Sequence, residues 1–313
     1  MLILARSCIF IVVTSLFAGL VSCTFTITNN CPYTIWPGTL AGAGTPPLST
    51  TGFQLDPGHS VSVASTPGWS GNIWARTGCE FDAFGIGRCE TGDCAGRLQC
   101  DGSGATPPIS LFEITLGQGE GKDFYDVSMV DGYNMPLMAV PRGGYGECNV
   151  TGCAWDLNLG CPKELQVVGG DKGGLVGCKS ACKAFALDQY CCSGQFANPT
   201  TCQPSYYSTI FKTACPRAYS YAFDDRTSTF TCKAQEYAII FCPRADGMNN
   251  DNAPPIQEYN RSSQALVSAA CSILPLPITM ILIIILLLLS TCKVFIDDRV
   301  VGWHSRIGFD AQN

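Results

Sequence analysis

The stretch GIGRCETGDCAGRLQC, residues 85–100, says more about the fold than any other part of this sequence. Three of its residues are cysteines, and they belong to a set of sixteen between Thr24 and Pro243. An even number of cysteines at this density, in a chain that begins with a secretory signal, implies disulfides formed in an oxidising compartment. The sequence therefore predicts a secreted domain framed by disulfides.

The other thirteen cysteines lie on both sides of this stretch. They are Cys31, Cys79, Cys148, Cys153, Cys161, Cys178, Cys182, Cys191, Cys192, Cys202, Cys215, Cys232 and Cys242. A zinc site is not expected, because the domain has one histidine, His59, and the cysteines do not form repeated two-residue-spaced pairs. The sequence also lacks a Gly-Lys-Ser/Thr phosphate loop, so it predicts neither a metal nor another cofactor.

Residues 1–23 read as a signal peptide. Arg6 precedes an apolar run from Ile9 to Leu20, which is too short for an ordinary membrane span. Cleavage after Cys23 would leave Thr24 as the mature N-terminus.

Residues 24–243 have the length of a single all-β domain. Period-two alternation or short apolar runs predict strands at 24–29, 59–64, 126–130 and 237–241. One segment, 179–189, has the composition of a helix, and it lies in the part of the chain that is densest in cysteine. The sequence thus predicts a β core with a disulfide-held, loop-rich subdomain around residues 148–215.

The C-terminal part of the chain contains a hydrophobic membrane signal. Residues 244–264 are polar and predict a linker, whereas residues 265–290 include an unbroken apolar run from Ile278 to Leu289. This segment is long enough to cross a hydrocarbon core of about 30 Å. Three interpretations stay open: a transmembrane helix followed by a short tail (291–313), a lipid-anchor signal, and an aberrant C-terminus from mispredicted splicing.

The net charge and two glycosylation sequons indicate what the domain surface binds and how it is modified. The chain carries 19 Lys and Arg against 25 Asp and Glu, a net charge of −6, and no basic stripe that would neutralise phosphates. A nucleic-acid partner is therefore not expected. Two sequons, at Asn149 and Asn260, predict N-glycosylation in the secretory pathway.

Five blocks of the sequence carry a family resemblance. Residues 85–100 match the signature of the thaumatin-like family of plant defence proteins, and residues 24–36, 73–79, 123–134 and 215–225 agree with it. The resemblance covers residues 24–243. It implies a mainly β fold: a thaumatin-like β-sandwich core, a disulfide-rich subdomain of loops and short helices, and a cleft between the two.

Sixteen cysteines allow about two million pairings, so spacing alone selects none of them. The family resemblance implies one set. It consists of Cys31–Cys242, Cys79–Cys89, Cys94–Cys100, Cys148–Cys232, Cys153–Cys215, Cys161–Cys178, Cys182–Cys191 and Cys192–Cys202.

The resemblance also implies an acidic cleft. Its four acids correspond to Glu113, Asp126, Asp131 and Asp224, but the basic position of the family is Asn72 in this chain. Because clustered carboxylates repel one another, the loss of this cation is expected to leave one acid protonated. Arg76, four residues further on, is a candidate substitute for the missing cation.

Aromatic side chains near these motifs are candidates for stacking on sugar rings. They are Tyr133, Tyr206, Tyr207 and Phe211. His59 follows an apparent turn and is expected to be a solvated loop residue, which leaves little material for Ser-His or Cys-His catalysis.

Three functions remain open at this point. The resemblance implies an extracellular, antifungal defence protein whose cleft binds β-1,3-glucan or a related cell-wall carbohydrate. The first alternative is a weak endo-β-1,3-glucanase that uses Glu113 and Asp126 as its acid and base. The second is a membrane-tethered ectodomain with a protein partner. The expected location is the extracellular face of the plasma membrane, through residues 265–290, or full secretion.

Overall fold

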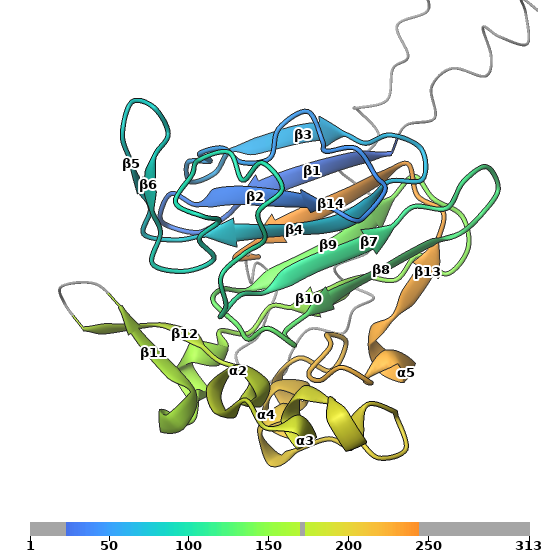
Figure 1. The fold of residues 1–313 in the computed structure, drawn as a ribbon. Helices are drawn as coiled ribbons and strands as arrows, with labels where there is room; N and C mark the ends of the chain where they lie inside the picture. The colour runs from blue at the N-terminus through green and yellow to red at the C-terminus, as the bar shows by residue number, and fades with distance from the viewer. Residues whose placement is uncertain (1–22, 170–172, 244–313) are drawn as a thin grey trace, which may run out of the picture. The chain divides into compact units, whose positions relative to one another are not determined.

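The computed structural model describes residues 23–169 and 173–243 (Figure 1). Several sequence predictions lie outside these ranges: the signal peptide apart from Cys23, the linker 244–264, the apolar segment 265–290, the tail 291–313 and the Asn260 sequon. Within the described ranges, every helix is too short or too polar to cross a membrane.

The first sheet has five strands. Their order is β10 (Thr151–Cys153), β9 (Leu137–Arg142), β14 (Glu236–Phe241), β1 (Thr24–Asn29) and β3 (Ser60–Ala64). In β1, Phe25 and Ile27 are fully buried while the alternating Thr24, Thr26 and Thr28 are half-buried, as expected for a strand with one face on the core. The predicted strands at 24–29, 59–64 and 237–241 therefore appear as β1, β3 and β14.

The second sheet also has five strands. Their order is β13 (Phe230–Cys232), β8 (Asp123–Ser128), β7 (Leu111–Thr115), β4 (Ser70–Arg76) and β2 (Trp36–Ala41). All neighbouring pairs in this sheet are antiparallel. The strand predicted at 126–130 is β8, which begins at Asp123 and ends at Ser128, before the turn that contains Asp131.

The two sheets pack face to face around an aromatic core. The Phe112 ring of β7 lies 6.3 Å from Phe25 and 5.9 Å from Tyr237, measured between ring centroids. Tyr125 of β8 lies 5.0 Å from Tyr237 in the same way. Such pairs add to the free energy of burying large apolar side chains. The predicted mainly β architecture with a sandwich core is confirmed.

Smaller elements complete the described fold. A hairpin is formed by β5 (Glu80–Phe81) and β6 (Gly87–Arg88), and a second one by β11 (Gln166–Gly169) and β12 (Gly174–Cys178). The helical elements are η1 (Leu157–Gly160), η2 (Lys163–Leu165), α2 (Ala181–Phe185), α3 (Asp188–Cys191), η3 (Gly194–Phe196), α4 (Tyr206–Ala214) and α5 (Asp225–Ser228). In Figure 1 the helices gather below the sheets, and the β5–β6 hairpin projects from the opposite end.

The subdomain differs in its limits from the prediction of 148–215. Its first residues belong to the sandwich, because β10 pairs with β9 in the first sheet. Its last helix, α5, extends to Ser228. The boundary was misplaced because residues 151–153 are too short to show the period of a strand.

The predicted single helix at 179–189 is wrong in its continuity. The structure has two short helices there, α2 and α3, because Ala186 adopts a left-handed conformation with φ of 52° that ends the first. The disulfide between Cys182 and Cys191 holds the two helices together. Helix propensity alone contains no sign of this break.

Helix α4 was missed by the sequence analysis. Ser205 caps it by accepting a hydrogen bond from the backbone N–H of Ser208, whose hydroxyl in turn accepts from the backbone N–H of Ser205. This reciprocal pair is a capping box made with serine instead of the usual Glu or Gln. Its start signal was therefore present in the sequence, in an unusual form.

Eight disulfides hold the domain, and each joins two cysteines that the family resemblance pairs. Strand pairing explains why Cys31 and Cys242 form a disulfide. Strands β1 and β14 run parallel, with Asn29 opposite Phe241, so the two cysteines that follow arrive side by side. This bond closes the longest loop, with a sequence separation of 211, and in the chain-entropy model it restricts the unfolded chain most.

Candidate functional site

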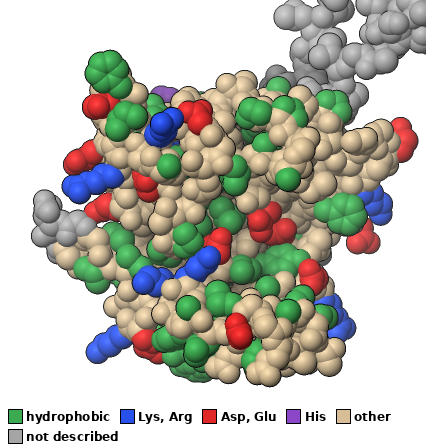
Figure 2. Space-filling view, in the orientation of Figure 1, with side chains coloured by type: hydrophobic (Ala, Val, Ile, Leu, Met, Phe, Trp, Pro, Cys, Tyr) green, Lys and Arg blue, Asp and Glu red, His purple; other side chains and the backbone are tan. Residues whose placement is uncertain are grey.

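Three adjacent strands place Asn72, Glu113 and Asp126 in one row. Asn72 of β4 is opposite Glu113 of β7, and Glu113 is opposite Asp126 of β8. Directly opposed side chains lie on the same face of a sheet, with Cβ atoms about 4.5–5.5 Å apart. Their neighbours Phe112 and Val127 point the other way and are fully buried in the sandwich core. The row therefore faces the helical subdomain, and Figure 2 shows acidic side chains in the hollow between the two.

Asp126 is the most strongly perturbed acid of this row. Burial, followed by the negative charges of Glu113 and Asp225, raises the pKa of Asp126 from 3.8 to about 8. Its Oδ1 atom is buried and has no hydrogen-bond partner among the described residues. Such an oxygen costs free energy in the folded protein, and it is an acceptor available to a ligand that carries donors.

Glu113 is perturbed in the same direction. Its pKa is raised, first by burial and then by the negative charge of Asp131, while a hydrogen bond with Ser128 lowers it in part. Glu113 and Asp126 are thus two neighbouring carboxyl groups that cannot both ionise easily. At mildly acidic pH the pair holds at least one proton.

The other two predicted acids have cations beside them. Lys183 of α2 lies 3.0 Å from an oxygen of Asp131, and Lys212 of α4 lies 2.9 Å from an oxygen of Asp224. Both lysines come from the subdomain. The positive charges of this region therefore hold Asp131 and Asp224, and none of the described ion pairs includes Glu113 or Asp126.

Asp224 is largely engaged in its own loop. One of its oxygens accepts hydrogen bonds from the Ser220 backbone N–H (3.0 Å) and the Ser220 hydroxyl (2.9 Å), and the other accepts from Thr227 (3.1 Å). Its neighbour Asp225 acts on the row instead, since its charge contributes to the raised pKa of Asp126. Sequence reasoning selected the first residue of this Asp-Asp pair and missed the second.

Asp225 is itself held in place by Tyr219. The Tyr219 hydroxyl donates a hydrogen bond to Asp225 at 2.7 Å. Neither Tyr219 nor Lys183 was identified as a site residue from the sequence. Their positions depend on how the subdomain folds over the sheet, and strand periodicity carries no signal for that.

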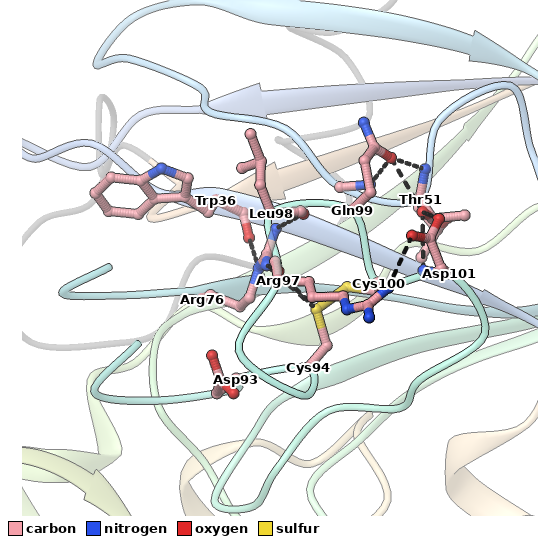
Figure 3. The surroundings of a disulfide bond; sticks show 12 residues. Trp36, Thr51, Arg76, Asp93, Cys94, Arg97, Leu98, Gln99, Cys100 and Asp101 are labelled. Atoms are coloured by element: carbon pink, nitrogen blue, oxygen red, sulfur yellow. Dashed lines mark hydrogen bonds and ion pairs between the residues drawn. A yellow bond between two sulfur atoms is a disulfide. The ribbon is translucent and has the colours of Figure 1, made fainter. Parts of the chain in front are cut away.

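Arg76 does not substitute for the missing cation. It lies on the same face of β4 as Asn72, but its guanidinium is buried at the far end of the strand (Figure 3). Its nitrogens donate to the carbonyl oxygens of Trp36 (2.9 Å), Arg97 (2.7 Å), Pro37 (3.1 Å) and Leu98 (2.8 Å). Burial lowers the pKa of Arg76 to about 10. The candidate substitution is therefore wrong, because residues 94–100 cover this end of the strand.

Two of the four predicted stacking residues are packing residues. Tyr133 and Phe211 are buried, and the Tyr133 hydroxyl donates to the Trp155 carbonyl oxygen at 3.0 Å. Tyr207 is half-buried and donates to Glu164 at 2.9 Å. Tyr206 is 75% exposed, so it alone of the four offers a largely open ring.

The remaining predicted residues lie away from the acidic row. His59 is exposed, with Nδ1 3.2 Å from the Pro57 carbonyl oxygen, and the Asn149 amide donates to the Glu147 carbonyl oxygen at 3.2 Å. Glycosylation of Asn149 stays a prediction. In residues 23–169 and 173–243, no group of three or more His, Cys, Asp or Glu side chains is arranged to hold a metal ion.

Comparisons with known proteins identify relatives over the same part of the chain. The Thaumatin family matches residues 29–243. Pathogenesis-related protein 5 of Arabidopsis thaliana is 58% identical over 219 residues, covering 70% of this chain and 90% of that protein. A glucan endo-1,3-beta-glucosidase of Prunus avium is 49% identical over 229 residues, covering 72% of this chain and 93% of that protein. A solved thaumatin-like xylanase inhibitor aligns with 70% of this chain and 99% of its own, at 24% identity and a TM-score of 0.38.

Proposed function

This chain belongs to the thaumatin family, and from that premise we propose that its acidic cleft binds β-1,3-glucan or a related neutral cell-wall polysaccharide. The observation that carries the proposal is the unpartnered, buried Oδ1 atom of Asp126 beside Glu113. Sugar hydroxyls are donors, and a hydroxyl that reaches this atom would relieve the cost of leaving it unsatisfied.

The amide at position 72 suits a neutral ligand. A cation there would favour ionisation of Glu113 and Asp126, whereas with Asn72 burial and mutual repulsion keep at least one proton on the pair at mildly acidic pH. A protonated carboxyl group donates one hydrogen bond and also accepts, and an ionised one only accepts. The pair can therefore satisfy a sugar hydroxyl in either sense, as donor or as acceptor.

The biological setting follows from the relatives by name. The name of pathogenesis-related protein 5 refers to a defence role, and the name of the Prunus avium relative refers to 1,3-β-glucan. We propose that this chain is an extracellular antifungal protein of the same kind. Eight disulfides agree with passage through an oxidising secretory pathway.

The test is co-sedimentation with insoluble β-1,3-glucan, with chitin and cellulose as comparison polymers. Asp126→Ala removes the unpartnered oxygen and is expected to weaken glucan binding by about tenfold. Glu147→Gln is the matched control, because Glu147 is exposed and its carboxylate has no partner among the described residues. Unchanged glucan binding by folded Asp126→Ala would contradict the proposal. Binding to none of the three polymers would favour the protein-partner alternative.

A weak endo-β-1,3-glucanase is the second candidate. It is supported by the direct opposition of Glu113 and Asp126, which permits the separation of about 5–5.5 Å that a retaining mechanism needs. Asp126, with its pKa of about 8, would be the proton donor, and Glu113 the carboxylate. Reducing-end release from laminarin measures this activity. No release, or release that is equal in Glu113→Ala, would exclude it.

The anchoring of the chain stays a prediction for residues 265–290. Treatment of membranes with phospholipase C separates the two forms of attachment. Release by the enzyme indicates a lipid anchor, release by detergent alone indicates a transmembrane helix, and recovery in the soluble fraction without either indicates full secretion.

A further inference from the structure

The end of the domain opposite the helices carries a second hollow. Its lining includes Trp36 of β2 and residues 80–82 at the β5–β6 hairpin, whose base carries the Cys79–Cys89 disulfide. Figure 1 shows β2 and this hairpin at the end of the domain away from the helices. Its volume is about 660 Å³, within the range of small-molecule sites. The side chains that define its chemistry are Trp36, Gln54, Glu80, Phe81, Asp82 and Leu98.

Arg76 fixes the walls of this hollow. Its guanidinium donates to the backbone oxygens of both Trp36 and Leu98, and its Cζ atom lies 5.5 Å from the centre of the Phe81 ring. Figure 3 shows Arg76 with the hydrogen bonds that join it to Trp36 and Leu98. Three of the four lining segments, which contain Trp36, Phe81 and Leu98, are therefore held by one buried side chain, and Gln54 belongs to the fourth. These three walls are in place before any ligand arrives.

The apolar part of the lining consists of two half-buried aromatic rings and Leu98. Trp36 and Phe81 expose part of their surface here while the rest is packed. Aromatic faces of this kind bind the C–H faces of sugar rings, and their limited rotational freedom keeps the entropic cost of binding low.

The polar part supplies hydrogen-bonding groups at the rim. The Oδ1 atom of Asp82 accepts from the backbone N–H groups of Phe84 and Ile86, both at 2.9 Å, which fixes its carboxylate in place. In the described part of the chain, the other Asp82 oxygen and the Glu80 carboxylate have no hydrogen-bond partner. The Gln54 amide nitrogen donates to Asp56 at 2.9 Å, which leaves its second N–H and its oxygen for a ligand.

Charges of both signs surround the hollow. Glu80 is opposite Arg88 in the hairpin register, so these two side chains share a face, and Arg76 lies against Phe81. The carboxylates of Glu80 and Asp82 belong to the hairpin region, and that of Asp56 accepts a hydrogen bond from Gln54 at 2.9 Å. Because the Arg76 guanidinium already occupies one side of the Phe81 ring, a cationic ligand would meet a positive charge there.

We propose that this hollow is a second binding site, separate from the acidic cleft, and that it takes a neutral saccharide unit. The ring of the sugar lies against Trp36 and Phe81, and its hydroxyls donate to Glu80 and Asp82. The two sites are distinct, because Asn72 and Arg76 lie about 13 Å apart along β4 and Trp74 packs between them. A long polysaccharide that engages both sites gains avidity over either alone.

The experiment uses soluble β-1,3-glucan oligosaccharides, with cello-oligosaccharides and chitin oligosaccharides as comparison probes. Binding is followed by NMR through the Trp36 indole N–H, assigned by its loss in Trp36→Phe. The Asp126→Ala background isolates the hollow from the cleft. We expect the Trp36 signal to shift with at least one saccharide, and Glu80→Ala to weaken that binding by about tenfold.

Variants of the aromatic wall complete the test. Phe81→Leu keeps apolar volume but removes the ring and should weaken saccharide binding, whereas Phe81→Tyr should restore it. Glu147→Gln should change nothing. A Trp36 signal that responds to no saccharide, or only to a polycation such as polylysine, would overturn the proposal. Failure of the acidic cleft gives a different result: Asp126→Ala leaves glucan binding unchanged while the Trp36 signal still shifts.

Discussion

Arg76 and Asp126 are ionisable side chains of the same sheet, and their polar atoms differ in how far their hydrogen bonds are satisfied. The Arg76 guanidinium donates to four carbonyl oxygens, whereas the Asp126 Oδ1 atom has no partner among the described residues. A buried polar group stabilises a fold when its hydrogen bonds are complete and destabilises it when they are not. Arg76 therefore belongs to the framework, and Asp126 carries an acceptor that the described part of the fold leaves unused.

The largest effect on stability is expected from substitution of Arg76. Arg76→Met leaves the carbonyl oxygens of Trp36, Pro37, Arg97 and Leu98 without this donor, and we expect the free energy of unfolding to fall by at least about 3 kcal/mol. Urea denaturation measures this change. It should be accompanied by loss of order in residues 94–100, visible by hydrogen exchange.

The matched control is Arg97→Met. The Arg97 side chain is 58% exposed, and its contact with Asp101 is long, at 4.0 Å. An exposed pair of this kind contributes less than about 1 kcal/mol. Equal destabilisation by the two variants would show that the hydrogen bonds of Arg76 are not what holds this end of the domain.

The raised pKa of Asp126 predicts that the stability of the folded chain depends on pH. Below pH 4 the Asp126 carboxyl is protonated in the folded and the unfolded chain. Between pH 4 and 8 the unfolded chain loses this proton while the folded chain keeps it, because the folded pKa is raised from 3.8 to about 8. Stability that is present at pH 4 is therefore lost as the pH rises to 8.

Asp126→Asn removes this titration. Wild-type protein should lose about 2 kcal/mol of unfolding free energy between pH 4 and 8 through this residue, a value reduced from the full shift because the row faces a cleft open to water. The variant should show a flatter profile of melting temperature against pH. A profile with the wild-type slope would mean that Asp126 ionises normally.

The sequence predicted those structural features of Arg76 and Asp126 that depend on local strand pattern. The strand at 24–29 was predicted correctly because one face is buried and the side chains alternate. The position of Arg76 on the face of Asn72 also follows from strand period. That its guanidinium is covered by residues 94–100 does not follow, because loop packing leaves no period in the sequence.

The acidic row shows the same limit. Glu113 and Asp126 lie in different strands, and their direct opposition is a property of register that neither segment encodes alone. The family resemblance selected both, and it also identified Asn72 as a departure. It gave no indication that Lys183 of α2 would lie 3.0 Å from Asp131, since this contact depends on how the subdomain packs against the sheet.

A cation placed at position 72 should lower the pKa of the neighbouring acids. Asn72→Lys places an ammonium group beside Glu113 in the register, and we expect the pKa of Asp126 to fall by about 1–2 units. Asn72→Gln is the neutral control. NMR titration of the carboxyl carbons measures the shift, and a pKa that stays equal in the two variants would show that burial, not the absent cation, sets the Asp126 value.

The smallest effect is expected at Lys183. Its side chain is 39% exposed and that of Asp131 is 35% exposed, so Lys183→Met should change the free energy of unfolding by less than about 1 kcal/mol. Its consequence is electrostatic, because Asp131 without its lysine acts more strongly on Glu113 and raises the pKa of that carboxyl further. The expected result is a pH profile of glucan binding that shifts to higher pH, with unchanged thermal stability.

The control is Lys163→Met. Lys163 is an exposed lysine of the same subdomain and forms no ion pair among the described residues, so this variant should leave the pH profile in place. Equal shifts in the two variants would mean that net charge, and not the contact with Asp131, governs the cleft.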